Sequence, residues 1–153
     1  MWCVKFQSAK VQAGNITTKQ LGVKHMKYEF SYGDPISEED ALAKLREMGL
    51  HAFAFDVNTE TNEPLHWHEF EGATWIISGS GSFADETGAV THVKAGCHSR
   101  FPAGWLHQEL AGTKVRVAIG TNLPYEKWTH PINKERDPHL VDFKRTAIPG
   151  QYR

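Results

Sequence analysis

Between residues 50 and 121 the sequence alternates apolar and polar side chains in short segments, which glycine- or aspartate-rich turn signals separate. Side chains of a strand point alternately to its two faces, so this pattern is typical of strands with one buried face. Regularly spaced short strands predict an all-β fold, either an antiparallel barrel or a sandwich. The predicted strands cover residues 51–57, 65–70, 73–78, 90–94, 98–101, 106–110 and 114–121, with turns at 71–72, 79–81 and 85–88.

One segment, from Ser37 to Gly49, has helical spacing instead. Ser37 suits the N-cap, three acidic residues follow it in the first turn, and Gly49 suits the position after the last turn. Apolar residues recur every three or four positions and form one stripe. We therefore predict a single short helix in the N-terminal half, with a structural packing role.

Composition and charge restrict the class of partner. The chain has 153 residues, of which 40% are hydrophobic, and its formal net charge is −1. Acidic and basic residues nearly cancel, so we expect neither nucleic acid nor a membrane as a partner. No segment approaches the roughly 18 apolar residues of a membrane span. Cys3 and Cys97 form no Cys-x-x-Cys pair and no signal peptide is visible, so we expect a cytoplasmic protein.

A chain of this length most simply forms one domain, covering residues 1–153. Residues 50–121 form its core, residues 1–49 supply N-terminal strands and the helix, and residues 122–153 form an irregular, proline-containing tail. We expect the tail to wrap the barrel or a partner subunit. Trp67 points away from its flanking histidines and is expected to pack against the helix or a partner. Together with the N-terminal strands, it suggests a homodimer.

Two histidine-bearing stretches carry the chemistry. His66 and His68 are two positions apart, so in a strand both imidazoles project from one face. His107 follows a Pro-x-Gly turn at residues 102–104. Imidazole is the commonest side-chain ligand of metals, and three protein ligands leave positions open for water, oxygen or substrate. The sequence therefore predicts a metal site that acts on a small molecule.

These stretches resemble the paired motifs of the cupin superfamily, G-x5-H-x-H-x3,4-E-x6-G and G-x5-P-x-G-x2-H-x3-N. In the first motif the His pair and Gly79 are in place, and Glu60 occupies the leading Gly position. In the second motif Ala111 replaces the terminal Asn. The resemblance covers about residues 50–121 and implies a double-stranded β-helix (a jelly-roll barrel) with the metal inside one end. Four residues of the second motif stand at the family spacing: Gly96, Pro102, Gly104 and His107.

The carboxylate of the first motif is displaced. Its two allowed positions hold Gly72 and Ala73, whereas Glu71 stands one residue early and Glu69 three residues early. A shift of one residue turns a strand side chain to the other face, but a bulge would return Glu71 to the site as a fourth ligand or an acid–base group. Without that carboxylate the resemblance is to the three-His cupins, which include thiol and β-diketone dioxygenases. It implies one divalent transition metal ion, with Fe(II) favoured and Ni, Mn, Zn or Cu as alternatives.

Four further residues are candidates for the pocket. His51 shares a strand face with two phenylalanines, and His98 lies two residues into the second motif. Thr74 has the inward parity expected after the metal strand, and Trp105 lies between the Pro-x-Gly turn and His107, where it would shield the entrance. The other histidines are expected at the surface: His25, His92, His130 and His139.

Three functions fit this pattern. The first is a mononuclear non-haem metal enzyme, a dioxygenase-like oxidoreductase acting on a small oxygenated metabolite, in which Glu71 is a catalytic candidate. The second is a non-catalytic cupin that binds or senses a metal and a small ligand. The third is a metal-dependent isomerase or cyclase of sugars or polyketides.

Overall fold

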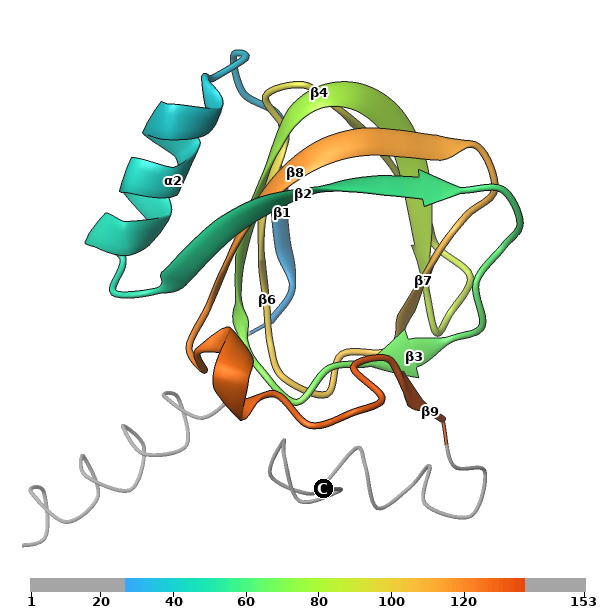
Figure 1. Ribbon diagram of the computed structural model, residues 1–153. Helices are drawn as coiled ribbons and strands as arrows, with labels where there is room; N and C mark the ends of the chain where they lie inside the picture. Colours follow the sequence, from blue (N-terminus) through green and yellow to red (C-terminus); the bar gives the residue numbers. More distant parts are fainter. Residues whose placement is uncertain (1–26, 137–153) are drawn as a thin grey trace, which may run out of the picture.

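The computed structural model describes residues 27–136, which form one curved antiparallel sheet with a single α-helix on its outside (Figure 1). The predicted all-β class with one short helix is confirmed. Of the N-terminal strands predicted within residues 1–49, one is present at Glu29–Ser31, and residues 1–26 lie outside the described range. In chain order the elements are β1 (Glu29–Ser31), α2 (Glu38–Glu47), β2 (His51–Thr59), β3 (His66–Trp67), β4 (Gly72–Asp85), β5 (Val90–Lys94), β6 (His98–Phe101), β7 (His107–Glu109), β8 (Thr113–Thr121), the 3-10 helix η1 (Tyr125–Lys127) and β9 (Lys134–Glu135).

The long strand β4 organises the sheet, because it pairs with β5, β6, β7 and β8. The turn predicted at residues 79–81 is wrong, since β4 runs through these residues: Gly79 and Ser80 pair with β8, and Gly81 pairs with β5. The strand bends instead of reversing: its register shifts between Ile76 and Ser78, and Gly79 has a φ of +84°, which favours glycine. Figure 1 shows the resulting arch of β4 over the sheet.

Other strand boundaries follow the predictions unevenly. Strands β5 and β6 have the predicted bounds, whereas β3 and β7 are shorter than the predicted segments 65–70 and 106–110. Strand β3 ends at Trp67 because the next residue pairs elsewhere: the His68 carbonyl accepts a hydrogen bond from the Gly104 N–H (2.9 Å) in the Pro-x-Gly turn. This contact fixes the two histidine-bearing stretches against each other.

Helix α2 covers the outer face of the sheet. The Ser37 side chain caps it by accepting a hydrogen bond from the Asp40 N–H (3.1 Å), as its position in the sequence predicts. Ala41 and Leu45 form its buried side and pack on the sheet with Ala73. No helix within residues 27–136 is long and apolar enough to span a membrane.

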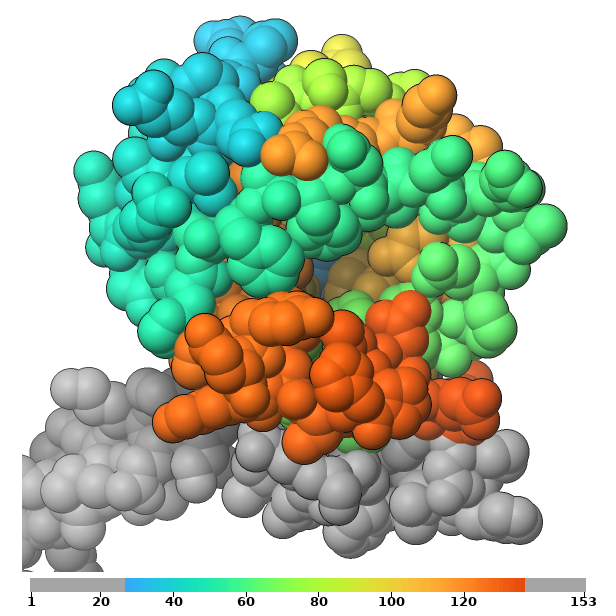
Figure 2. Space-filling model, in the orientation of Figure 1, coloured from blue at the N-terminus to red at the C-terminus, as the bar shows by residue number. Residues whose placement is uncertain are grey.

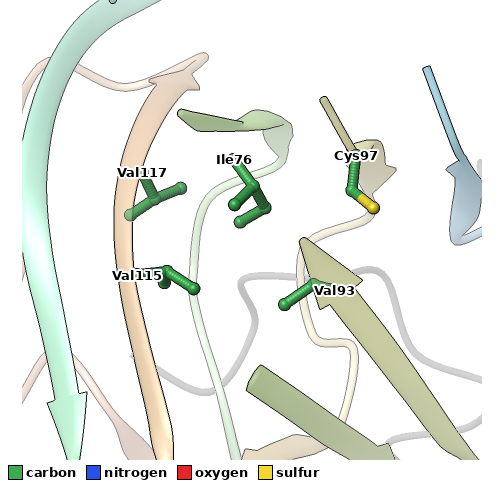
Figure 3. Close-up of a cluster of buried hydrophobic side chains, with 5 residues drawn as sticks. All are labelled: Ile76, Val93, Cys97, Val115 and Val117. Carbon is green, nitrogen blue, oxygen red and sulfur yellow. The ribbon is translucent and has the colours of Figure 1, made fainter. Parts of the chain in front are cut away.

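A cluster of buried apolar side chains fills the inner side of the sheet. They come from β4, β5, β8 and the segment just before β6 (Figure 3). Cys97 is 1% exposed and packs here as a small apolar residue. The five members of the cluster are Ile76, Val93, Cys97, Val115 and Val117.

Residues 122–136, the described part of the predicted tail, lie along β3. Strand β9 pairs with β3, and the buried Glu69 carboxylate accepts hydrogen bonds from the N–H (2.6 Å) and the hydroxyl (2.7 Å) of Thr129. The Trp67 indole N–H donates to the carbonyl of Glu135 (3.2 Å). Trp67 therefore packs beside β9, whereas the prediction was packing against the helix or a partner subunit.

Candidate metal centre

Three imidazoles meet where β3 and β7 pair. His66 and His107 are direct partners across these antiparallel strands. His68 lies two residues after His66, and its ring returns to the same side. The ligand nitrogens of the three residues lie within 4.8 Å of one another, and the ring centroids are 4.5 to 5.1 Å apart. The structure thus brings together the three ligands that the sequence predicts.

A backbone carbonyl lies beside the Nδ1 atom of each ring. The partners are Pro64 for His66 (2.9 Å), Ile132 for His68 (3.2 Å) and Trp105 for His107 (3.0 Å). A carbonyl oxygen only accepts hydrogen bonds, so each Nδ1 must carry the hydrogen. In the neutral ring the Nε2 lone pair is then left for a metal, which is the usual arrangement of metal-binding histidines.

Burial keeps the imidazoles of His68 and His107 neutral. His66 is 4% exposed and His107 is 8% exposed. Burial, reinforced by the neighbouring imidazoles, lowers the pKa of His68 to about 3 and that of His107 to about 4. Metal ligation needs the unprotonated ring, so these two rings are ready to bind at neutral pH.

Aromatic rings fix the orientation of two ligands. Trp105 stacks on His107 with ring centroids 4.4 Å apart and planes within 9°, and Phe70 stacks on His68 at 5.0 Å and 3°. Tyr28 in turn stacks on Trp105 at 4.1 Å. Two ligand rings are therefore held between a backbone hydrogen bond and an aromatic face, which limits their motion.

The carboxylate of Glu109, which was not among the predicted site residues, also faces the three imidazoles. One oxygen of Glu109 lies 3.5 Å from His66 Nε2, and the other lies 3.9 Å from His107 Nε2. Glu63, which lies beside Glu109, completes a second group of facing ligand atoms with His66 and Glu109. Burial and the adjoining Glu109 raise the pKa of Glu63. The signal in the sequence was the spacing of Glu109 two positions after His107, the same spacing that joins His66 to His68.

Glu71 is placed differently from these groups. Its backbone N–H donates to the Asn122 side chain (3.1 Å) and its carbonyl accepts from the Asn122 N–H (3.0 Å). Within the described residues, its side chain belongs to neither group of facing ligand atoms. Glu71 therefore lies at the junction with the tail segment, outside both clusters.

The two family positions for a carboxylate are unsuitable for one in this fold. A Cβ at Gly72 would collide with the carbonyl of Gly120. Ala73 is buried with Ala41 and Leu45 under the helix, on the side of β4 away from Thr74. A carboxylate at either position would thus be blocked or would point out of the site.

A cavity of about 180 Å³ adjoins the imidazoles. Figure 2 shows this face of the molecule hollowed between β2 and the segment 122–136. Most of the lining is aromatic or aliphatic, and the predicted pocket residues Thr74, His98 and Trp105 belong to it. His51 is exposed at the start of β2 and does not line the cavity. The Thr74 hydroxyl hydrogen-bonds the Ser99 hydroxyl (2.6 Å) on the wall.

No protein-family model and no curated protein matches the sequence. Among solved structures, the DMSP lyase DddQ from Ruegeria pomeroyi is similar at 20% identity over 56% of this chain and 45% of that one, with a TM-score of 0.43. The polyketide cyclase RemF from Streptomyces resistomycificus is 20% identical over 64% and 72%, also at 0.43. Oxalate decarboxylase from Bacillus subtilis, which has Mn(II) centres, is 18% identical over 68% and 33%, at 0.41. The matched region spans less than half the length of the lyase and of the decarboxylase.

Proposed function

We propose that this chain, whose fold and three-imidazole site are those of the cupin superfamily, binds one divalent transition metal ion and uses it on a small molecule. The observation that carries the proposal is the cluster of His66, His68 and His107, each with its Nδ1 hydrogen-bonded to a carbonyl and its Nε2 left for a metal. Three protein ligands leave coordination positions open, as in metal sites that act on substrates.

The cavity lining supports an uncharged, partly aromatic substrate with an oxygen atom for the metal. Phe30, Phe83 and Trp105 are among its aromatic walls, and no Lys or Arg of the described chain lines it. The metal ion would pair with one anionic group, but the lining offers no cationic side chain for a second, so small dicarboxylates fit this lining poorly. Apolar walls with a few polar groups are typical of sites for small organic ligands.

Tyr28 is the polar group best suited to orient such a substrate. Its ring stacks on Trp105, and its buried hydroxyl has no hydrogen-bond partner among residues 27–136. Burial raises the pKa of this phenol, although the nearby Ser99 hydroxyl acts in the opposite direction. Tyr28 therefore stays protonated and offers an O–H to an oxygen of the bound molecule.

Within this proposal a dioxygenase-like reaction with Fe(II) fits best, because three neutral imidazoles suit Fe(II) and leave room for oxygen beside substrate. The metal, when bound, would supply Lewis acidity and a site for oxygen. The protein would orient the three ligands through their carbonyl partners, keep water out with its aromatic walls and orient the substrate through Tyr28. Binding or sensing without turnover is the alternative, favoured by the scarcity of acid–base groups in the lining, where Glu109 is the one carboxylate.

Metal analysis of protein purified without added metal tests the site. We expect about one transition metal ion per chain in the wild type and a loss of at least about tenfold in metal content for His107→Ala. His51→Ala is the matched control, because His51 is exposed on β2, and it should retain full metal content. If His107→Ala kept all of its metal, the proposed site would be wrong.

Oxygen uptake then tests the reaction. The iron-loaded protein is offered aromatic diketones, thiols and enediols, together with a small dicarboxylate for comparison. We expect uptake with an uncharged aromatic compound and none with the dicarboxylate. Bound metal with no uptake across the whole panel would favour the binding or sensing function.

A further inference from the structure

We propose that Glu109 is a fourth ligand of the metal and replaces the carboxylate that the first cupin motif lacks here. This inference rests on the proposed function, because it assumes that the three imidazoles hold a metal. It adds a ligand from β7, downstream of the second motif's histidine, where the family pattern places no carboxylate.

The distances suit a shared ion. Donor atoms bound to one metal at about 2.1 Å lie roughly 3.0 Å apart at right angles and roughly 3.4 Å apart in a tetrahedron. Glu109 Oε2 lies 3.5 Å from His66 Nε2, and Glu109 Oε1 lies 3.9 Å from His107 Nε2. Glu109 therefore reaches two of the three imidazoles, one with each carboxylate oxygen, at distances slightly longer than those between ligands of one ion.

The atoms that face each other are both acceptors. His66 Nδ1 donates to the Pro64 carbonyl (2.9 Å), so in the neutral ring Nε2 presents a lone pair. It faces Glu109 Oε2, which also presents a lone pair, and both atoms are buried without a hydrogen-bond partner among residues 27–136. Two buried acceptors that face each other repel, and either a metal ion between them or a proton on Nε2 would remove the repulsion. His66 is 4% exposed, so bulk water cannot supply this partner freely.

The local structure holds Glu109 in this position. It lies two residues after His107 on β7, which puts both side chains on one face of the strand. Its carbonyl accepts a hydrogen bond from the Glu63 N–H (2.9 Å), and β7 pairs with β4 at Phe83. The Glu109 backbone is thus held between the Glu63 N–H on one side and strand β4 on the other. The family position at Gly72, in contrast, has no room for a side chain.

A carboxylate changes the character of the centre. It lowers the net charge of a divalent site from +2 to +1, and an oxygen donor beside imidazoles suits Mn, Fe, Co and Zn more than soft metals such as Cu(I). We therefore expect a four-ligand site with one oxygen donor, in which two positions of an octahedron stay open.

Cobalt titration of the full-length protein tests this ligand. We expect Glu109→Gln to raise the Kd for Co(II), measured against a competing chelator, by more than about tenfold and to shift the visible absorption of bound Co(II). Glu109→Leu, which has no donor atom, should behave in the same way. Glu71→Gln is the matched control and should change neither quantity, because Glu71 lies outside both clusters.

The possible outcomes separate this inference from the proposed function. If Glu109→Gln left both the Kd and the spectrum unchanged while His107→Ala abolished binding, the metal site would stand and the fourth ligand would be wrong. A raised Kd with an unchanged spectrum would also overturn ligation and leave only an electrostatic effect. A wild type that bound no Co(II) would overturn the proposed function together with the inference. Thermal melts in chelator check folding, and neither Glu109 variant should melt earlier than the wild type.

Discussion

At the scale of single residues, a carbonyl beside each ring decides which nitrogen of His66, His68 and His107 can bind a metal. The sequence predicted the three residues because the period of a strand and the spacing of a Pro-x-Gly turn are local properties. It could not predict that Ile132 fixes His68, because these residues come together only in the folded chain. Glu109 was missed although it obeys the same period, because the family pattern drew attention to Glu71.

The buried imidazoles predict a pH dependence of stability in the metal-free protein. The pKa of His68 is lowered to about 3 and that of His107 to about 4, whereas both lie near 6.5 in the unfolded chain. The unfolded chain therefore binds more protons between about pH 4 and pH 6.5, and stability must fall as the pH falls through this window. From pH 7 to pH 5 we expect a loss of roughly 4 kcal/mol in the free energy of unfolding.

Urea unfolding in the presence of a chelator measures this loss. The double variant His68→Gln, His107→Gln should show a clearly flatter dependence between pH 7 and pH 5, whatever its stability at pH 7. Equal slopes for the variant and the wild type would mean that other groups cause the pH dependence.

At the scale of elements, pairing between strands forms the site. The predicted strand bounds were accurate where clear turn residues flank a strand. Strands β5 and β6 were predicted with their correct bounds, because clear turn signals flank them. The prediction ended strand β4 at residue 78, since Gly79 looks like a turn residue in sequence but bends a continuous strand in the fold. The direct pairing of His66 with His107 depends on register between distant strands, which no local pattern specifies.

The contact between Glu69 and Thr129 predicts that the tail segment controls a ligand. Glu69→Gln removes a charged acceptor of two short hydrogen bonds and should loosen residues 129–132, including the carbonyl that holds His68 Nδ1. We expect a roughly tenfold weaker affinity for Co(II), as for other lost supports of metal ligands.

Hydrogen exchange across residues 128–135 should rise in Glu69→Gln. Glu126→Gln is the control, because Glu126 is exposed in the neighbouring η1 helix and should leave both measurements unchanged. Weaker metal binding without faster exchange would contradict a role through the tail segment.

At the scale of the whole molecule, the site joins parts of the chain that lie far apart in sequence. Ligands come from β3, from the residue just after it and from β7, while residues 122–136 close one side. The homodimer remains a proposal. One of its two arguments from sequence is weaker, because Trp67 is 3% exposed in the single chain and lies beside β9. The other rests on the N-terminal strands, and β1 is the one that lies within the described residues.

A ligand shell assembled from distant segments predicts that metal stabilises the complete fold. The unfolded chain cannot hold its histidines together, so at a free metal concentration 100 times the Kd we expect a gain of about 2.7 kcal/mol. Thermal unfolding with Zn(II) and with chelator measures the difference, and His107→Ala should abolish it. A wild-type melting temperature that did not respond to metal would contradict this expectation.

The hydrogen bond from His68 to the Ile132 carbonyl also bears on when, during synthesis, the metal can be bound. A chain leaving the ribosome exposes its two His motifs well before residue 132 emerges. Until then His68 lacks its orienting partner, so an early-bound ion would sit in an incomplete shell. Metal loading is therefore expected to be a late step of biogenesis, and translation products that stop short of this residue should be poor in metal.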